Sequence, residues 1–361
     1  MNEAAVLTSP RSPLVVQSLP IPSPAPHELL IKVHFIGVNA IEAKISKQAT
    51  PPPPSYPFIP GSSYTGTVSA VGSQVTEYQV GDRVLISKRF GTQGNAYGAY
   101  QRYAIVAAGE KIIISVPGWF TDSEEKALVA VVMNASCVPG LFSGRLGLRR
   151  PDFRENEQRN DDEAGVRQIE TSKKEKILVY GGSSSFGRLA VQYLGCAGYD
   201  VTTTSSPLHM ASVRSLIGSD NQVIDHTQPP ERVIAELKAR GPYDIVVDMI
   251  STPQTIPLTS RILVAQGGGK LFTTQPAFGP ECLPEGVERI FEPWSDSLYE
   301  EGNEGLMEWV VGMYLPFGME KGWMSGQVVE MVEGLEGVDV VLRGMIEGCA
   351  SGKRFVVEVV G

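Results

Sequence analysis

Cysteine and histidine are both scarce in this sequence, and neither shows the spacing of a metal or disulfide site. They lie far apart, and no two cysteines form a C-x-x-C pair: Cys137, Cys196, Cys282, Cys349, His27, His34, His209 and His226. This pattern predicts neither a disulfide framework nor a zinc site, so we expect no bound metal. Reduced cysteines are typical of the cytoplasm, where we expect the protein to be.

Positive charge is also in short supply. The formal net charge is -9 at pH 7 and the pI is about 5.2. Nucleic acids and anionic membranes bind proteins through a basic excess, so we expect neither as a partner. No stretch reaches the roughly 18 apolar residues that cross a bilayer, and the N-terminus has no basic start followed by an apolar run. The sequence predicts a soluble, unprocessed protein and leaves small neutral or weakly anionic ligands open.

The chain does contain enough apolar sequence for two domains. It has 361 residues, 42% of them hydrophobic, which is more than one ordinary domain contains. Residues 1–130 read as short strands broken by Gly and Pro, which predicts a β-rich domain. From residue 177 strand-like apolar runs alternate with helical patterns, which predicts a doubly wound parallel sheet in an α/β domain over 131–317. We expect the strand-like end of 318–361 to complete the first domain.

A charged stretch interrupts the second domain. Residues 145–176 are about half charged and contain almost no large apolar side chains, so they cannot form a core of their own. We expect a surface-exposed, mobile insertion. A docking site is the alternative.

The segment YGGSSSFGRLAVQ, residues 180–192, has the pattern of a dinucleotide-binding turn, with Ser184 at the usual place of the middle glycine. It joins a strand-like run to a helical pattern, which is the context that this fingerprint requires. Backbone N–H groups at such a helix N-terminus face a pyrophosphate. The residues expected to form the turn or donate to phosphate are Gly181, Gly182, Ser183, Ser184, Ser185 and Gly187. A vestigial turn is the alternative.

The next strand favours NADPH over NADH. Asp200 lies about 20 residues beyond the turn, where an acid that binds the NAD ribose is often found, but it opens the strand. Ligands of parallel sheets lie beyond the carboxyl ends of the strands. Hydroxyl groups that can bond a 2′-phosphate stand at that end, in Thr204, Ser205 and Ser206. His209 and Arg214 add positive charge, although Arg214 can equally belong to a solvated helix face.

Several segments together resemble one family. They are NEAAVL, FIGVNAIEAK, GTVSAVG, VTEYQVGDRV, YGAYQRY, the glycine turn and the closing SGKRFVVEV. The chain resembles the medium-chain dehydrogenase/reductase superfamily along essentially its whole length, above all the zinc-free quinone oxidoreductases and the trans-acting enoyl reductases of fungal polyketide pathways. The resemblance implies a GroES-like catalytic domain and a Rossmann domain. The zinc-dependent branch has a cysteine within the segment GVNAIEAK and Gly-His-Glu at Gly61, Ser62 and Ser63, so the resemblance implies a zinc-independent enzyme.

The resemblance also implies roles for individual residues. Asn39, Lys44 and Ser136 would be catalytic residues. Asn39 would stand at the cleft edge of the first domain and Lys44 nearby would touch cofactor or substrate, although either can equally be a turn or surface residue. Ser136 would lie near the nicotinamide, and Asn134 would line the substrate pocket. The cofactor would contact Phe186 and the neighbouring serines through its pyrophosphate, Ser206 and His209 through its 2′-phosphate, His226 through its adenosine, and Ile250 and Ser251 through its nicotinamide ribose. Thr273, Thr274 and Gln275 would face nicotinamide and substrate.

Reduction of a carbon–carbon double bond conjugated to a carbonyl suits a site without metal. The protein must hold nicotinamide and alkene in contact and place hydrogen-bond donors at the enolate oxygen. We expect an NADPH-dependent enoyl reductase for a small or carrier-bound substrate, which makes a polyketide synthase a candidate partner. The alternatives are quinone reduction and a repurposed, non-redox cyclase or isomerase. Candidate proton donors are Tyr64, Tyr97, Tyr100 and bulk water.

Overall fold

The computed structural model describes residues 1–50, 54–118, 120–153, 174–217, 222–277, 279–322, 327–349 and 352–359. It divides into two compact units: unit 1 comprises Met1–Ser136 and Leu298–Gly361, and unit 2 comprises Cys137–Ser297. We predicted a first domain that ends at 130 and resumes at 318, so both unit boundaries differ from that prediction. Tyr299 shows why unit 1 resumes earlier, because it donates a hydrogen bond to Glu110 of the same unit. Residues 154–173, most of the predicted charged insertion, lie outside the described residues.

Unit 1 is built mainly on antiparallel strands, although β14 pairs with β15 in parallel. β1 pairs with β2, β6 pairs with β3, and the main sheet has the order β14-β15-β3-β4-β5-β7. The strands are β1 Asn2–Leu7, β2 Leu14–Leu19, β3 Glu28–Val38, β4 Ser63–Val71, β5 Arg83–Ser87, β6 Tyr103–Ala107, β7 Ile113–Ser115, β14 Val328–Glu333 and β15 Lys353–Glu358. The expected return of the C-terminal strand is confirmed, since β15 lies antiparallel to β3.

A bulge in β3 sets which side chains face the core of unit 1. Leu29, Ile31 and Val33 belong to the core before the register shift between Val33 and Phe35, and Ile36 and Val38 belong to it afterwards. Alternate residues of a strand face opposite sides, so an inserted residue moves the core positions from odd to even numbers. This shift brings the apolar end of β3 into the core just before Asn39.

Short helices complete unit 1. They are α1 Ala40–Ala43, η1 Lys44–Gln48, η2 Asn95–Tyr97, α2 Asp122–Val129, α9 Glu304–Trp309, η5 Val310–Tyr314, α10 Leu315–Glu320, η6 Leu335–Gly337 and α11 Val338–Ile346; α3 Val132–Pro139 and η4 Trp294–Tyr299 each cross a unit boundary. Thr121 begins α2 through a reciprocal capping box with Glu124.

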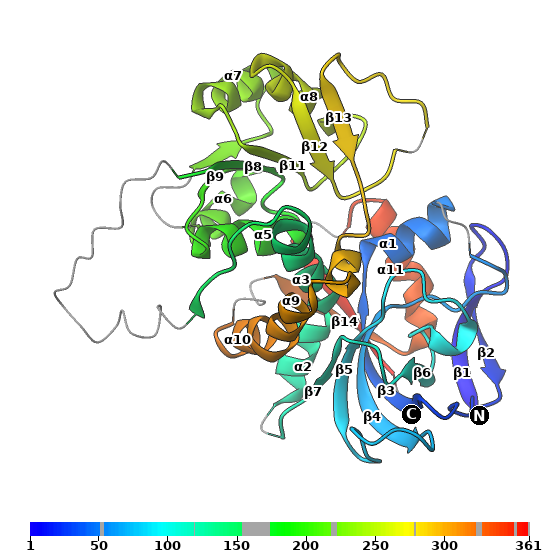
Figure 1. The fold of residues 1–361 in the computed structure, drawn as a ribbon. Helices are drawn as coiled ribbons and strands as arrows, with labels where there is room; N and C mark the ends of the chain where they lie inside the picture. Colours follow the sequence, from blue (N-terminus) through cyan, green and yellow to red (C-terminus); the bar gives the residue numbers. More distant parts are fainter. Residues whose placement is uncertain are drawn as a thin grey trace. The chain divides into compact units, whose positions relative to one another are not determined.

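Unit 2 is a parallel sheet with the strand order β10-β9-β8-β11-β12-β13. The strands are β8 Lys176–Tyr180, β9 Asp200–Ser205, β10 Gln222–Asp225, β11 Ile245–Asp248, β12 Gly269–Thr273 and β13 Val287–Ile290. The helices within the unit are η3 Gly140–Arg145, α5 Ser185–Cys196, α6 Pro207–Arg214, α7 Pro230–Arg240 and α8 Thr255–Ala265. The predicted doubly wound sheet is confirmed (Figure 1).

The strand order of unit 2 reverses between β8 and β11. From β8 the chain runs outward through β9 and β10, then returns to the other side of β8 with β11. In open parallel sheets the crevice at such a reversal, beyond the carboxyl ends of the strands, is where ligands bind. The glycine turn after β8 therefore lies at this position.

In the described parts of the chain, no single helix has both the length and the apolar composition needed to cross a membrane; the bent pair Asp122–Val129 and Val132–Arg145 meets the two criteria when its halves are taken together.

Candidate functional site

The turn after β8 leaves no room for side chains at its glycines. Gly181 has a φ of +93°, in the left-handed region that favours glycine. A Cβ there would lie 2.6 Å from Cγ1 of Ile250, and a Cβ on Gly187 would lie 2.1 Å from the carbonyl oxygen of Gly181. The Gly181 N–H donates to Oγ1 of Thr204 over 2.9 Å, which fixes the turn against β9. The turn thus keeps a bare backbone surface.

Ser184 starts the helix that follows the turn. Its backbone is extended, and its Oγ accepts a hydrogen bond of 3.0 Å from the Gly187 N–H. A serine N-cap is a favoured helix start, so the missing middle glycine does not disturb the strand, turn and helix geometry. The first turn of a helix carries N–H groups without intrahelical acceptors, and this arrangement holds pyrophosphates. The Ser184 hydroxyl also retains a hydrogen that it can donate.

Beyond the carboxyl end of β9, two of the residues predicted to bind the 2′-phosphate lie together on α6, whereas Ser205 is buried. Ser206 is the N-cap of α6 and His209 lies on its first turn, so the structure brings these two together. Ser205 is completely buried, and its hydroxyl donates to the carbonyl oxygen of Ser206 over 3.0 Å. The structure therefore does not bring the Ser205 side chain to this surface. Asp200 stands at the opposite end of β9.

One carboxylate near this end was missed by sequence reasoning. Asp225 ends β10 and pairs in register with Ser205. Its Oδ1 accepts from the hydroxyl and the N–H of Thr227, at 2.7 and 2.8 Å, and these bonds hold the pKa of Asp225 below its usual range. The signal was present, because QVID reads as a strand that ends in an acid. His226 follows, exposed, with its ring centroid 6.5 Å from that of Tyr180.

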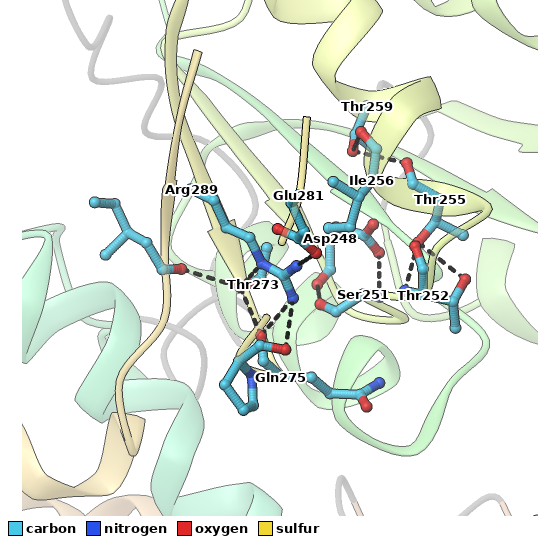
Figure 2. A network of polar contacts seen from close by, with 12 residues as sticks. Asp248, Ser251, Thr252, Thr255, Ile256, Thr259, Thr273, Gln275, Glu281 and Arg289 are labelled. Carbon is cyan, nitrogen blue, oxygen red and sulfur yellow. Dashed lines mark hydrogen bonds and ion pairs between the residues drawn. The ribbon is translucent and has the colours of Figure 1, made fainter. Parts of the chain in front are cut away.

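A polar network joins the carboxyl ends of β11 and β12 (Figure 2). Oδ1 of buried Asp248 accepts from the N–H groups of Ile250 and Ser251, at 2.9 and 2.8 Å, and Ser251 has a φ of +56°. The Ser251 Oγ donates to the Asp248 carbonyl oxygen and accepts from the Thr274 N–H, at 2.6 and 2.8 Å. Burial raises the pKa of Asp248. The carboxylate thus shapes the predicted nicotinamide-ribose loop.

Two further side chains fasten this loop to β12. The Gln275 amide donates to the Ile250 carbonyl oxygen over 2.6 Å, and the Thr274 hydroxyl donates to the Met249 carbonyl oxygen over 3.0 Å. The structure therefore brings the predicted residues Ile250, Ser251, Thr274 and Gln275 together. The Gln275 amide nitrogen and the Thr274 hydroxyl therefore donate to backbone carbonyl oxygens of this loop.

Arg289 on β13 holds the far side of the same network, and no motif in the sequence indicates this role. Its side chain is 6% exposed and forms an ion pair with Glu281. Nε donates to the Thr273 hydroxyl over 3.2 Å, and Nη2 donates to the carbonyl oxygens of Gln275 and Pro276 over 2.7 and 3.1 Å. Figure 2 shows the guanidinium between these groups. Thr273 is itself buried, so its hydroxyl acts here as a support.

In unit 1 the predicted catalytic residue Asn39 is buried at the start of α1. The residue is 3% exposed, and its Nδ2 donates to the Gly37 carbonyl oxygen and the Ser63 hydroxyl, over 3.2 and 3.3 Å. Its backbone N–H donates to Oε2 of Glu42 over 2.8 Å. These bonds make Asn39 a helix cap within a polar cluster.

Glu42 is the centre of that cluster and was also missed by sequence reasoning. Its Oε1 accepts from the N–H and the hydroxyl of Ser62, at 2.9 and 2.7 Å, and its Oε2 accepts from the Tyr100 hydroxyl at 2.6 Å. Ser62 and Ser63 stand where the zinc-dependent branch has histidine and glutamate. Zinc sites use Cys, His and carboxylate ligands, so hydroxyls already bonded to Glu42 and Asn39 do not fit one. Over the described ranges, no group of three or more His, Cys, Asp or Glu can hold a metal ion.

Lys44 differs from its neighbours because its ammonium has no partner within the described part of the chain. It opens η1, and burial lowers its pKa to about 8. Lys47 on the same element forms an ion pair with Asp339 on α11 and donates to the Ser12 carbonyl oxygen over 3.1 Å. Lys44 therefore stands on a firmly held element while its own ammonium is available.

The remaining predicted residues of unit 1 are engaged or buried. The Ser136 hydroxyl donates to the Met133 carbonyl oxygen over 2.8 Å, inside α3, and Asn134 is half-buried on the same helix. Tyr64 is 1% exposed, and burial raises its pKa. The Tyr97 hydroxyl donates to Glu28, and the Tyr100 hydroxyl donates to Glu42. None of the three tyrosines presents an unengaged, solvent-accessible hydroxyl in the described structure.

Comparison with known proteins agrees with this architecture. Residues 25–118 match the alcohol dehydrogenase GroES-like domain. The dehydrogenase mokE of Monascus pilosus is 32% identical over 94% of this chain and 92% of its own length. The trans-enoyl reductase himH of Aspergillus japonicus is 29% identical over 92% of this chain and 90% of its own.

Among solved structures, a quinone oxidoreductase of Pseudomonas syringae pv. Tomato DC3000 has a TM-score of 0.71 at 18% identity, with 99% of this chain and 100% of that chain covered. This likeness concerns the fold alone. Together with the relative that is 32% identical along almost its full length, these findings confirm the resemblance in the sequence: the chain belongs to the medium-chain dehydrogenase/reductase superfamily of oxidoreductases, in the branch of the fungal dehydrogenases and trans-enoyl reductases.

Proposed function

We propose that the protein uses NADPH, without zinc, to reduce a carbon–carbon double bond conjugated to a carbonyl. The observation that carries this proposal is the glycine turn, which packs too tightly for a Cβ at Gly181 or Gly187 and leads directly into the N-terminus of α5, where N–H groups can face a pyrophosphate. The residues present therefore fit a nicotinamide dinucleotide. When bound, the cofactor supplies the hydride.

The 2′-phosphate would be held at the start of α6. Ser206 offers a hydroxyl that does not cap its own helix, and His209 lies on the first helical turn. Asp225 is the nearest carboxylate by register, and its Oδ1 is bonded to Thr227. These features support NADPH over NADH, because the acid of NAD-binding relatives is expected at the end of β9.

Lys44 would give the proton that completes the reduction. An ammonium with a pKa of about 8 is largely protonated at pH 7 and is a stronger acid than an ordinary lysine. The three tyrosines proposed from the sequence are buried or bonded to carboxylates, so Lys44 is the better donor. Asn39 and Glu42 would position α1, from which η1 continues.

The acceptor class follows from the relatives. One of them carries the name trans-enoyl reductase, which supports an enoyl group, small or carrier-bound, in polyketide or other secondary metabolism. A polyketide synthase would then be the partner that delivers it.

The test is absorbance loss of NADPH, with NADH in parallel, across enoyl thioesters, enals, enones and quinones, followed by mass analysis of the product. We expect a gain of about two daltons on the alkene and faster oxidation of NADPH than of NADH. If only quinones are reduced, the substrate in this proposal becomes a quinone in place of the conjugated alkene. Conversion of a substrate at unchanged mass, with NADPH intact, would favour the cyclase or isomerase.

A further inference from the structure

Arg188 is a half-buried cation on α5 of unit 2. It lies on the first turn of α5, four residues after the N-cap Ser184, and its Nη1 donates to Oγ of Ser212 on α6 over 2.6 Å. Within the described ranges its guanidinium bonds this hydroxyl and forms no ion pair with a carboxylate. A guanidinium keeps its charge at any physiological pH, so burial without a counter-charge is unfavourable. The structure therefore contains a positive charge that an anion would stabilise.

The position of Arg188 indicates which anion. Ser212 lies three residues after His209, so the two share one face of α6. The same helix begins at Ser206. Arg188 thus joins the start of the helix that follows the glycine turn to the helix that follows the carboxyl end of β9.

The acid that ends β10 forms no ion pair with Arg188 in the described structure. Asp225 ends the neighbouring strand, and its Oδ1 is bonded to Thr227. A phosphomonoester dianion matches a guanidinium better than a single hydroxyl does, because its oxygens accept two parallel N–H bonds. Holding α5 against α6 would need no charge, and a neutral donor to Ser212 would suffice.

We propose that Arg188 binds the 2′-phosphate of NADPH and sets the preference for NADPH over NADH. This inference rests on the cofactor proposed above. Ser206 and His209 then contact the phosphate from the start of α6, while Arg188 supplies the charge from α5.

The test compares 2′,5′-ADP with 5′-AMP by titration calorimetry, so it needs no substrate and no turnover. We expect Arg188→Gln to weaken 2′,5′-ADP about 30-fold and to leave 5′-AMP unchanged, because one charge-assisted contact to the extra phosphate is lost. Arg188→Lys should fall between Arg188→Gln and wild type, since lysine keeps the charge and loses the forked geometry. Arg232→Gln, exposed on α7 of the same unit, is the matched control and should change neither affinity.

Ser212→Ala separates binding from helix packing. It removes the hydrogen bond to α6 and keeps the guanidinium, so we expect 2′,5′-ADP affinity within about threefold of wild type. If Ser212→Ala matches Arg188→Gln, or if Arg188→Gln weakens both nucleotides equally, Arg188 is a packing residue and the inference is overturned. If the wild type prefers 2′,5′-ADP and Arg188→Gln keeps this preference, the proposed role of Arg188 is overturned while the NADPH specificity stands. A wild type without any preference overturns the proposed NADPH specificity itself, and reductase turnover with NADH then decides the remaining function.

Discussion

Buried carboxylates organise both units, and they do so in different ways. Asp248 in unit 2 accepts from two backbone N–H groups and fixes the loop through Ser251. Glu42 in unit 1 accepts hydrogen bonds from the hydroxyls of Ser62 and Tyr100. It also accepts from the backbone N–H groups of Asn39 and Ser62. Unit 2 therefore uses its polar groups to hold a backbone shape. Unit 1 uses them to fix side chains around η1, whose Lys44 has no partner among the described residues.

The difference assigns one task to each unit. A backbone surface held rigid at the carboxyl ends of strands suits binding of a dinucleotide. A titratable ammonium on an anchored element suits proton transfer. Changes in unit 2 should therefore affect cofactor affinity, and changes around η1 should affect the rate of the chemical step or the stability of unit 1.

The largest effect is expected when the backbone surface of unit 2 is filled. Gly187→Ala would place a Cβ 2.1 Å from the Gly181 carbonyl oxygen, and backbone must move to relieve this contact. We expect NADPH affinity, measured by fluorescence titration, to fall at least about a hundredfold. Gly305→Ala, where a Cβ meets nothing within 4 Å, is the control. Wild-type affinity in Gly187→Ala would contradict the geometry of the turn.

Glu42→Gln should produce the next largest effect, and it should appear in stability. A glutamine amide would turn N–H groups toward donors that now bond a carboxylate oxygen. We expect the free energy of unfolding of unit 1, measured in urea, to fall by about 2–3 kcal/mol. Glu231→Gln removes an exposed carboxylate from an ion pair with Arg261 and should cost less than about 1 kcal/mol. Equal losses would mean that the Glu42 cluster has no special role.

Lys44→Met should slow the reaction and leave NADPH binding intact. We expect kcat to fall about a hundredfold, the size typical of a lost general acid. In the wild type the rate should decline as pH rises through about 8, because the deprotonated amine cannot donate. The stability of the protein should increase while the rate falls. Between pH 8 and the usual lysine pKa of 10.5 the unfolded chain binds more protons than the folded chain, so the free energy of unfolding rises with pH in that window. A pH profile identical in Lys44→Met and wild type would exclude this role.

Arg289→Gln should have the smallest of these effects. It removes the donors that hold Thr273 and the carbonyl oxygens of Gln275 and Pro276. We expect the KM for the acceptor to rise about tenfold, with a smaller change in kcat. Glu281→Gln removes the negative charge beside the buried guanidinium but keeps an amide oxygen that can accept from it, and the bonds to Thr273, Gln275 and Pro276 remain, so we expect the KM to rise only about threefold. A larger rise in KM for Glu281→Gln than for Arg289→Gln would mean that acceptor binding depends on the ion pair and not on the hydrogen bonds to Thr273, Gln275 and Pro276.

Sequence reasoning was strong where periodicity is strong. The alternation of apolar strands and helices predicts the parallel sheet of unit 2, and the glycine turn follows because its context is local. The supporting residues could not be predicted in the same way. Glu42 and Tyr100 lie 58 residues apart, and a lone acid in an apolar segment does not indicate its partners. Likewise, Ser205 and Ser206 look equivalent in sequence, although one is fully buried.

The measurement that tests the central claim most directly is hydride transfer from NADPH deuterated at the nicotinamide C4 position to a conjugated enone. The account predicts a product with one deuterium at the β carbon and a solvent proton at the α carbon. Mass spectrometry counts the deuterium, and NMR locates it. An enone that stays unreduced while a quinone is reduced, or a product that forms at unchanged mass without loss of NADPH, would contradict it.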